Sequence, residues 1–275
     1  MARSPISDFR ASAPRTLAPL LDGATQRLTP WLLPLGIVLG WQAASSAGLV
    51  STRFMPAPLD VIAAGWQLGR TGELWANLWV STLRALAGFA VGGGIGFALG
   101  LANGLSRASD RLTDTTVQMV RNVPHLSLIP LVILWFGIGE EAKLFLVALG
   151  VFFPVYANTL HGIRSVDPQL VEMGRVYGLS SFSLFTRVVL PGALPSIFVG
   201  LRYALGIMWL TLIVAETISA SSGLGYMAMQ AREFMLVDVV VLAIVIYAGL
   251  GKLADVLTRW LERTCLAWNP AYRTV

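Results

Sequence analysis

Ionisable side chains inside apolar stretches are the first candidates for chemistry in this chain. A charged group is costly inside a bilayer, so such residues often mark a substrate or ion pathway. Arg121 and His125 flank Pro124 near the start of one apolar stretch, and Glu216 lies near the end of another. We predict that Arg121, His125 and Glu216 line a translocation path. For each, the alternative is a structural role: Glu216 paired with an arginine, or His125 satisfied by packing.

Two further arginines, Arg84 and Arg202, also fall in apolar stretches. Their long side chains can snorkel to a membrane interface, which is how we interpret them. No catalytic set accompanies these groups. Two histidines and one cysteine cannot build a metal site. The single Gly-Lys pair, at Gly251, is followed by leucine and forms no phosphate-binding loop. We therefore expect no enzyme activity and no cofactor in this chain.

The composition indicates a membrane protein. Of 275 residues, 55% are hydrophobic and only 13% are charged, whereas soluble domains carry nearer a quarter charged residues. Apolar runs of about 20 residues are long enough to cross a bilayer. We predict an all-α membrane protein with about six spans: Trp31–Ala47, Leu78–Leu105, Val117–Phe136, Leu144–Gly162, Leu194–Ile218 and Val237–Leu257.

The arginines predict the orientation of these spans. They concentrate before the first span, after the sixth and in alternate loops, which is the pattern of cytoplasmic segments. We therefore predict that both termini are cytoplasmic. We attribute the pI near 9.8 to the arginines that set this membrane orientation rather than to nucleic-acid binding. The expected parts are a disordered tail (1–30), a first span with an external amphipathic segment (31–76), a core (77–260) and a C-terminal tail (261–275). Within the external segment, Leu59–Leu68 is expected to be a short surface helix after a proline-rich break, although a plain connector fits equally well.

The second span carries five glycines spaced four residues apart. In a helix they form one stripe that lets another backbone approach closely. We expect packing inside one subunit, with a dimer seam as the alternative. The five are Gly88, Gly92, Gly96, Gly100 and Gly104.

The moderately polar segment Glu172–Pro191 separates the fourth and fifth spans, and it reads as two short helices joined by a glycine. Asp167 and Pro168 are typical of a helix start. Gly178 supplies a left-handed end to that helix, and a second helix is expected over Ser181–Val189, stopped by Pro191. Such a compact knob on the cytoplasmic side can lodge in a partner and transmit motion. An ordinary capped loop is the alternative.

This segment resembles the coupling loop of ABC-importer permeases, in which Glu-Ala-Ala is followed at fixed distances by Gly and by Ile-x-Leu-Pro. Glu172 and Gly178 match the pattern, whereas three positions differ by small or apolar replacements. The expected coupling residues, within the loop 164–193, are Glu172, Met173, Gly174, Gly178, Val188, Leu190 and Pro191.

Longer segments, over 121–163 and 190–228, look like the permease of bacterial aliphatic sulfonate importers; taurine, nitrate and thiamine-precursor permeases form the wider group. The resemblance implies a type I importer fold in the bacterial inner membrane. It implies two copies of this chain, two cytoplasmic ATPase subunits that carry ATP and Mg²⁺, and an extracytoplasmic binding protein that delivers the substrate. Other small anions or metabolites remain alternative substrates. The rival classes are an ATP-independent secondary transporter and, less well supported, a membrane enzyme.

Overall fold

The computed structural model describes residues 18–51 and 54–269, and within these ranges the secondary structure is helical. The chain divides into two units, residues up to Asp60 and residues from Val61 onward.

The first unit is dominated by helix α1 (Ala18–Ser46), which contains Pro30 and Pro34. It begins at Ala18, inside the segment for which the composition predicted no structure; residues 1–17 lie outside the described residues. The helix is long, but it is not among those apolar enough to count as a candidate span. Its large apolar residues end at Trp41, and Gln42, two alanines, Ser45 and Ser46 follow. The expected first span, Trp31–Ala47, is therefore not supported by this criterion.

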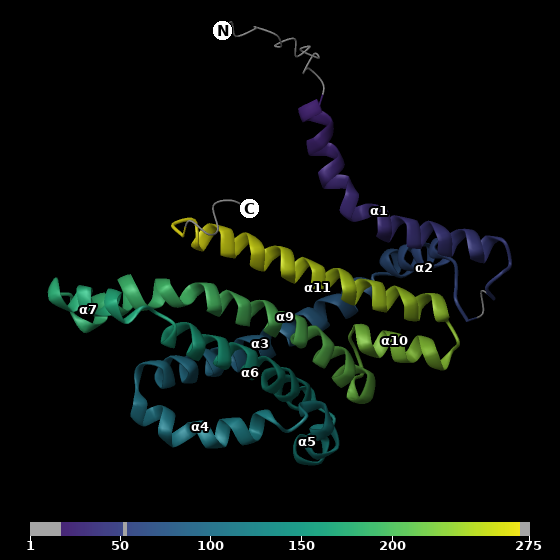
Figure 1. Cartoon of the computed structure of the whole chain (residues 1–275). Coiled ribbons are helices and arrows are strands. Elements are labelled where there is room, and N and C mark those ends of the chain that lie inside the picture. Colours follow the sequence, from purple (N-terminus) through teal and green to yellow (C-terminus); the bar gives the residue numbers. More distant parts are fainter. Residues whose placement is uncertain (1–17, 52–53, 270–275) are drawn as a thin grey trace, which may run out of the picture. The chain divides into compact units, whose positions relative to one another are not determined.

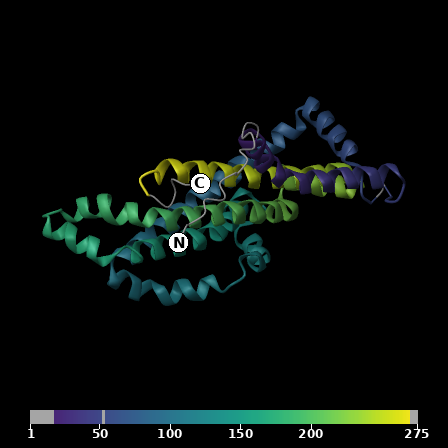
Figure 2. The ribbon, with the colours of Figure 1, turned by 45° about the horizontal axis from the view of Figure 1, so that its top comes forward.

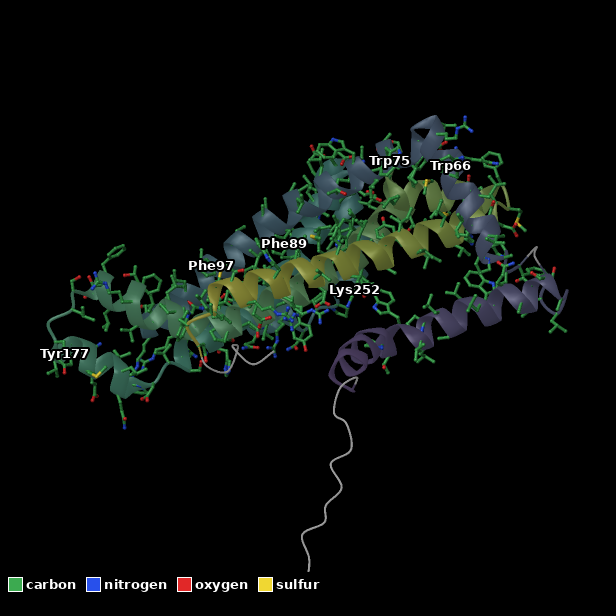
Figure 3. All side chains as sticks on the ribbon, turned by 90° about the horizontal axis from the view of Figure 1, so that it is seen from above. Trp66, Trp75, Phe89, Phe97, Tyr177 and Lys252 are labelled. Carbon is green, nitrogen blue, oxygen red and sulfur yellow. The ribbon has the colours of Figure 1, made fainter. Side chains whose placement is uncertain are left out.

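Helix α2 (Pro58–Thr71) confirms the short helix expected after the proline-rich break. The Asp60 carboxylate accepts a hydrogen bond from the Ala57 amide (3.1 Å) and so caps the helix start. Trp66 on α2 and Trp75 at the start of the next helix are both exposed and lie together at one end of the second unit (Figure 3). Exposed tryptophans at one level are typical of a membrane–water interface.

The second unit contains four helices that are long and apolar enough to cross a membrane, among the residues described. They are Glu73–Leu105 (α3), Glu140–Arg164 (α6), the continuous stretch Ser181–Ile218, most of which is α9 (Leu190–Ser219), and Val237–Cys265 (α11). A bent helix pair raises the number of spans to five. The residues described thus contain four or five candidate spans, compared with the six that we expected. Helix α11 also runs to Cys265, inside the expected C-terminal tail.

Helices α3, α6 and α9 form the centre of this unit, with α11 beside α9 and the short α10 (Leu224–Glu233) between them at one end (Figures 1 and 2). Water is not available to drive helices together in a bilayer, so close packing has to do this work. The central cluster includes the buried apolar side chains of Val147, Val151, Met208 and Leu212.

The glycine stripe of α3 lies against α6 of the same chain, as expected. A Cβ added to Gly92 would overlap the backbone of Ala148. One added to Gly96 would lie 2.6 Å from the carbonyl oxygen of Phe152. A Cβ added to Gly88, Gly100 or Gly104 would also come closer to α6 than van der Waals contact allows. The absence of side chains therefore sets how closely these two spans approach.

The expected third span is broken rather than straight. Helix α4 (Arg107–Arg121) and the following segment, a 3-10 turn (η1, His125–Leu128) joined to α5 (Ile129–Phe136), are bent by 80°. Asn122 to Pro124 form the break. Pro124 donates no backbone hydrogen bond, and it disfavours helical geometry at the residue before it. The span expected over Val117–Phe136 is therefore interrupted at Pro124.

Candidate functional site

The knob between α6 and α9 begins with the helix start that the sequence predicts. The Asp167 carboxylate accepts a hydrogen bond from the Gln169 amide (2.9 Å), and Pro168 is the first residue of helix α7 (Pro168–Val176). Proline loses nothing there, because the amide of a first helical residue has no partner within the helix. Aspartate also interacts favourably with the positive end of the helix dipole.

Gly178 ends α7 in the left-handed conformation, with φ = 76°. The Leu179 amide donates to the carbonyl of Gly174 (3.0 Å), and the Gly178 amide donates to the carbonyl of Arg175 (3.0 Å). This pair of bonds is the Schellman motif, which satisfies the last carbonyls of a helix and requires positive φ at the residue after the cap. The expected cap is confirmed.

The second helix of the knob differs from the expectation at its far end. It starts where predicted, as α8 (Ser181–Leu184), with the Ser180 hydroxyl accepting from the Ser183 amide (3.2 Å). It then passes through a π-helical turn (η2, Phe185–Val189) directly into α9. Pro191 does not stop the chain. Because the wider turn ends just before it, Pro191 falls in the first turn of α9, where a missing amide is tolerated.

The knob presents apolar side chains to its surroundings. Val176, Tyr177 and Phe182 are each more than three-quarters exposed, and Figure 3 shows Tyr177 at the end of the bundle opposite Trp66 and Trp75. A cavity of about 740 Å³ lies beside them. Several expected coupling residues line it, namely Met173, Gly174, Val188 and Pro191, together with Trp268 from the C-terminal segment. Exposed apolar patches of this kind mark interaction surfaces.

The remaining expected coupling residues occupy different positions on the knob. Glu172 is exposed on α7 and makes no ion pair with Arg175, although both residues are described. Leu190 is half-buried at the start of α9. Gly174 is buried, because the Leu184 side chain of α8 packs directly over it. The knob therefore consists of an interior that holds α7 against α8 and an outer surface that includes Glu172.

The break in the third span carries the two expected cationic candidates. Arg121 is exposed at the end of α4, and His125 is half-buried at the start of η1. The His125 ring Nε2 lies 3.2 Å from the Thr211 hydroxyl of α9. A side chain placed at Gly150 of α6 would also approach this ring nitrogen. The break thus brings the His125 ring of η1 against the Thr211 hydroxyl of α9. In a membrane, such irregular backbone is tolerated where it lines a cavity or is covered by protein.

Arg84 lies in a buried ion-pair cluster rather than at an interface. It is 5% exposed, and its guanidinium makes two bonds to Glu140 of α6 (2.5 and 2.6 Å) and one to Glu216 of α9 (2.8 Å). The Ser222 carbonyl accepts a further bond at 2.6 Å. Lys143 adds a second cation on Glu140 (3.1 Å). The snorkelling interpretation is therefore wrong for Arg84: two carboxylates fix its guanidinium among the helices.

Glu216 is 1% exposed and fully supplied with donors. The Ser81 hydroxyl lies 2.8 Å from both carboxylate oxygens, the Tyr247 hydroxyl donates at 3.0 Å, and the Gly225 amide donates at 2.9 Å. These donors come from α3, α11 and α10. Glu216 and Arg84 together therefore join α3, α6, α9, α10 and α11, which favours the pairing alternative that the sequence left open for Glu216.

Arg202 is partly exposed and forms ion pairs with Glu262 and, at 3.6 Å, with Asp255, both on α11. It ties the other half of α9 to α11. The sequence drew attention to Arg84, Arg202 and Glu216, but it gave no signal for their partners, because those lie on other spans far along the chain.

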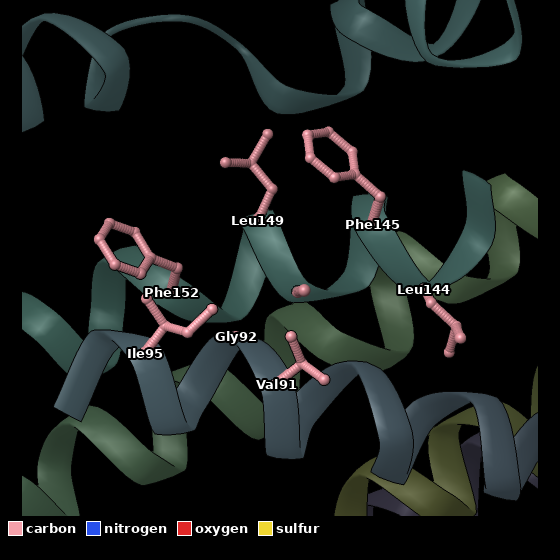
Figure 4. Close-up of a pocket in the computed structure, with 8 residues that line it drawn as sticks. Val91, Gly92, Ile95, Leu144, Phe145, Leu149 and Phe152 are labelled. Carbon is pink, nitrogen blue, oxygen red and sulfur yellow. The ribbon is translucent and has the colours of Figure 1, made fainter. Parts of the chain in front are cut away.

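A separate cavity of about 260 Å³ lies between α3 and α6, and Figure 4 shows that its lining is apolar. Val91, Gly92 and Ile95 come from α3, and Leu144, Phe145, Leu149 and Phe152 come from α6. It offers no hydrogen-bond donor or charge to an ionic substrate, so the polar groups at the break are better candidates for the path.

Comparison with known proteins assigns the chain to a family. A profile described as the inner membrane component of binding-protein-dependent transport systems matches residues 92–265. The chain belongs to this family of permeases and is therefore a multi-pass inner membrane component of a transport system. An aliphatic sulfonates transport permease of Escherichia coli (strain K12) is 65% identical over 90% of this chain and 94% of its own length.

Two further relatives are more distant. An aliphatic sulfonates transport permease of Bacillus subtilis (strain 168) is 44% identical over 88% of this chain and 87% of its own length. A taurine transport system permease of Escherichia coli (strain K12) is 36% identical over 83% of this chain and 85% of its own length.

Proposed function

We propose that this chain is the permease subunit of an ATP-driven importer and forms the path for aliphatic sulfonates delivered by an extracytoplasmic binding protein. The observation that carries the substrate assignment is the 65% identity, over nearly the whole chain, with a permease named for aliphatic sulfonates. The taurine permease is a more distant relative, and the compound in its name also carries a sulfonate group. Other small anions remain the second candidate class.

The knob 164–193 is proposed as the contact with a cytoplasmic ATPase. Its two helices are fixed by a side-chain cap and a Schellman turn, and its outer surface presents exposed apolar side chains beside the charged Glu172. A rigid knob transmits a displacement, whereas a flexible loop would absorb it. At the far end, the knob runs without interruption into α9. A movement of the ATPase would therefore reach the Thr211–His125 contact along one helix.

The assembly that follows from this proposal is symmetric. An ATPase dimer presents two equivalent sites, so two copies of this chain are the simplest match. ATP and Mg²⁺ would bind to the ATPase subunits, since the chain has no phosphate-binding loop. Both termini and the knob would face the cytoplasm, as the arginine distribution predicts.

Arg121 and His125 are proposed to meet the anion at the break in the third span. An anion needs a favourable but shallow path, because a deep site would trap it. A single exposed arginine and an imidazole satisfy this requirement, whereas Glu216 is occupied by its own donors. We therefore assign Glu216 to holding the helices around the path rather than to contacting the anion.

The substrate assignment is tested by uptake of radiolabelled ethanesulfonate in cells that lack their own sulfonate importers. Expression of the chain with its ATPase and its binding protein should restore uptake, and unlabelled alkanesulfonates should compete better than nitrate or bicarbonate. Glu172→Lys, which reverses a charge on the outer surface of the knob, should reduce uptake while the protein stays in the membrane. Stronger competition by nitrate or bicarbonate would replace the sulfonate assignment.

A further inference from the structure

Two cavities lie next to each other along α4 and the second half of α6, on the side of the knob. The first, of about 250 Å³, is lined by Val117, Gln118 and Arg121 of α4 and by Tyr156, Ala157, Leu160, His161 and Arg164 of α6. The second, of about 500 Å³, is lined by the end of α3, by Arg107, Asp110 and Arg111 of α4, and by Arg164. Arg164 belongs to both linings. It is the first residue of the knob and stands three residues before Asp167, the N-cap of α7.

The charge of these linings is strongly positive. Together they contain four arginines against one aspartate, an excess of three positive charges (4 − 1). The aspartate is already paired, because Asp110 binds Arg164 at 2.7 Å. Arg107, Arg111 and Arg121 make no ion pair with any residue that the structure describes. Asp114, on the same helix, accepts a weak hydrogen bond from Gln118 (3.4 Å).

The arrangement of the cations matters as much as their number. Arg121 and His161 are both exposed on facing helices, and they line one cavity with Arg164 at its far end. Guanidinium groups present forked donors that match the oxygens of a tetrahedral anion. An imidazole adds one further ring N–H. Several partly solvated donors in series bind an anion weakly at more than one point, which permits passage.

The volume restricts the ligand. A cavity of about 250 Å³ lies just below the range of about 300–1,000 Å³ that holds drug-sized molecules, so it suits a compact one. The apolar cavity between α3 and α6 has nearly the same volume but contains no charge. Size alone therefore does not distinguish the two cavities, and the cationic lining does.

We propose that the α4–α6 cavities form an anion-binding chamber for small molecules with a tetrahedral oxyanion group, with Arg121, His161 and Arg164 as its principal ligands and Arg107 and Arg111 at its outer rim. This proposal rests on the proposed function and extends it, since Arg121 would pass the anion from the break in the third span into the chamber, which would release it beside the knob. Arg164 would act in both cavities, because its other guanidinium nitrogens remain available beside the Asp110 contact.

A cysteine reporter tests the chamber directly. Ala157→Cys, in a background with Cys265→Ser, is purified as the complete transporter in nanodiscs of zwitterionic lipid. It is then reacted with an anionic methanethiosulfonate reagent (ethylsulfonate) and with its cationic trimethylammonium counterpart. A cleft lined by one sign of charge raises the local concentration of the opposite ion by about 10- to 1,000-fold. We therefore expect the anionic reagent to react at least about tenfold faster, after correction for intrinsic reactivity.

Three comparisons make this result specific. Arg121→Gln in the reporter background should reduce the preference several-fold, and Ala148→Cys, on the same helix but in the apolar cavity, should react slowly with both reagents. Ethanesulfonate should protect the Ala157→Cys reporter. A second reporter, Leu160→Cys, repeats the measurement if the first disturbs assembly. Equal rates for the two reagents at both reporters, or a preference unchanged by Arg121→Gln, would overturn the proposal.

The source of the anion is distinguished by the lipid. If the chamber serves a lipid phosphate, adding anionic phospholipid to the nanodiscs will protect the reporter and ethanesulfonate will not. That outcome would overturn the transport role of the chamber. Failure of the sulfonate assignment has a different signature: the anionic preference would remain, but the uptake experiment would show a different substrate.

Discussion

Replacing Arg84 with methionine should strongly destabilise the bundle. The substitution leaves Glu216 at 1% exposure without its cation, although Ser81, Tyr247 and the Gly225 amide still donate to it. Removing one partner of a buried ion pair costs about 3–5 kcal/mol. At about 2–4 °C per kcal/mol for a chain of this size, the apparent melting temperature should fall by roughly 6–20 °C. The assay is thermal unfolding of the purified complex in nanodiscs, monitored by the loss of the monodisperse peak in gel filtration after heating.

Matched variants distinguish the stability that the ion-pair cluster contributes as a whole from the contribution of each charged side chain. The Glu140 side chain is 53% exposed, so Glu140→Gln should cost only about 1 kcal/mol or less. The double variant Arg84→Met/Glu216→Met removes both charges, and its loss should be smaller than the sum of the two single losses. Additive losses, or an Arg84→Met protein that melts within about 2 °C of the parent, would refute the argument that a buried cluster joins these helices.

Three further predictions concern the helix contact, the knob and the path. Gly92→Leu should prevent stable insertion into the membrane, because a side chain there overlaps the Ala148 backbone. Gly94→Ala should be tolerated, because a Cβ there has nothing within 4 Å. Expression level and gel filtration compare the two variants. Gly178→Asp should cost about 1–2 kcal/mol through its left-handed φ and reduce ATPase retention and uptake, measured by co-purification and transport. Arg121→Gln and His125→Gln should each lower uptake while the complex stays assembled.

Each of these predictions has an outcome that would contradict it. A normal yield of the Gly92→Leu protein would mean that α3 and α6 can move apart without loss of stability. Wild-type retention and wild-type uptake of Gly178→Asp would remove the knob from the coupling role. Unchanged uptake in both Arg121→Gln and His125→Gln would assign those two residues to packing or to the interface.

Local chemistry explains why much of the knob could be predicted. The Asp167 cap, the Pro168 start and the left-handed Gly178 depend on residues within a few positions of one another, and all three are confirmed. The prediction that Pro191 stops the second helix of the knob was wrong for a local reason as well. The rule that proline ends a helix assumes the preceding turn is α-helical, and the π turn over Phe185–Val189 changes that register.

Longer-range features were less accessible from one sequence. Nothing near Arg84 in the sequence indicates that Glu140 and Glu216, on two other spans, hold its guanidinium. The 80° break between α4 and α5 was signalled by Pro124, but hydropathy alone reads across it as one span. The sequence did not indicate that Arg121, His161 and Arg164 line one cavity, because His161 and Arg164 lie at the end of a different helix from Arg121.

The central claim is that this chain moves sulfonates only when an ATPase acts on its knob, and reconstitution in liposomes tests it most directly. Uptake of labelled ethanesulfonate is measured with the chain, its ATPase and its binding protein, and then with each component omitted in turn. The account predicts uptake only when all three proteins and Mg-ATP are present, with ATP on the ATPase side. Accumulation of the sulfonate by this chain alone, without ATP, would contradict the account and favour a secondary transporter.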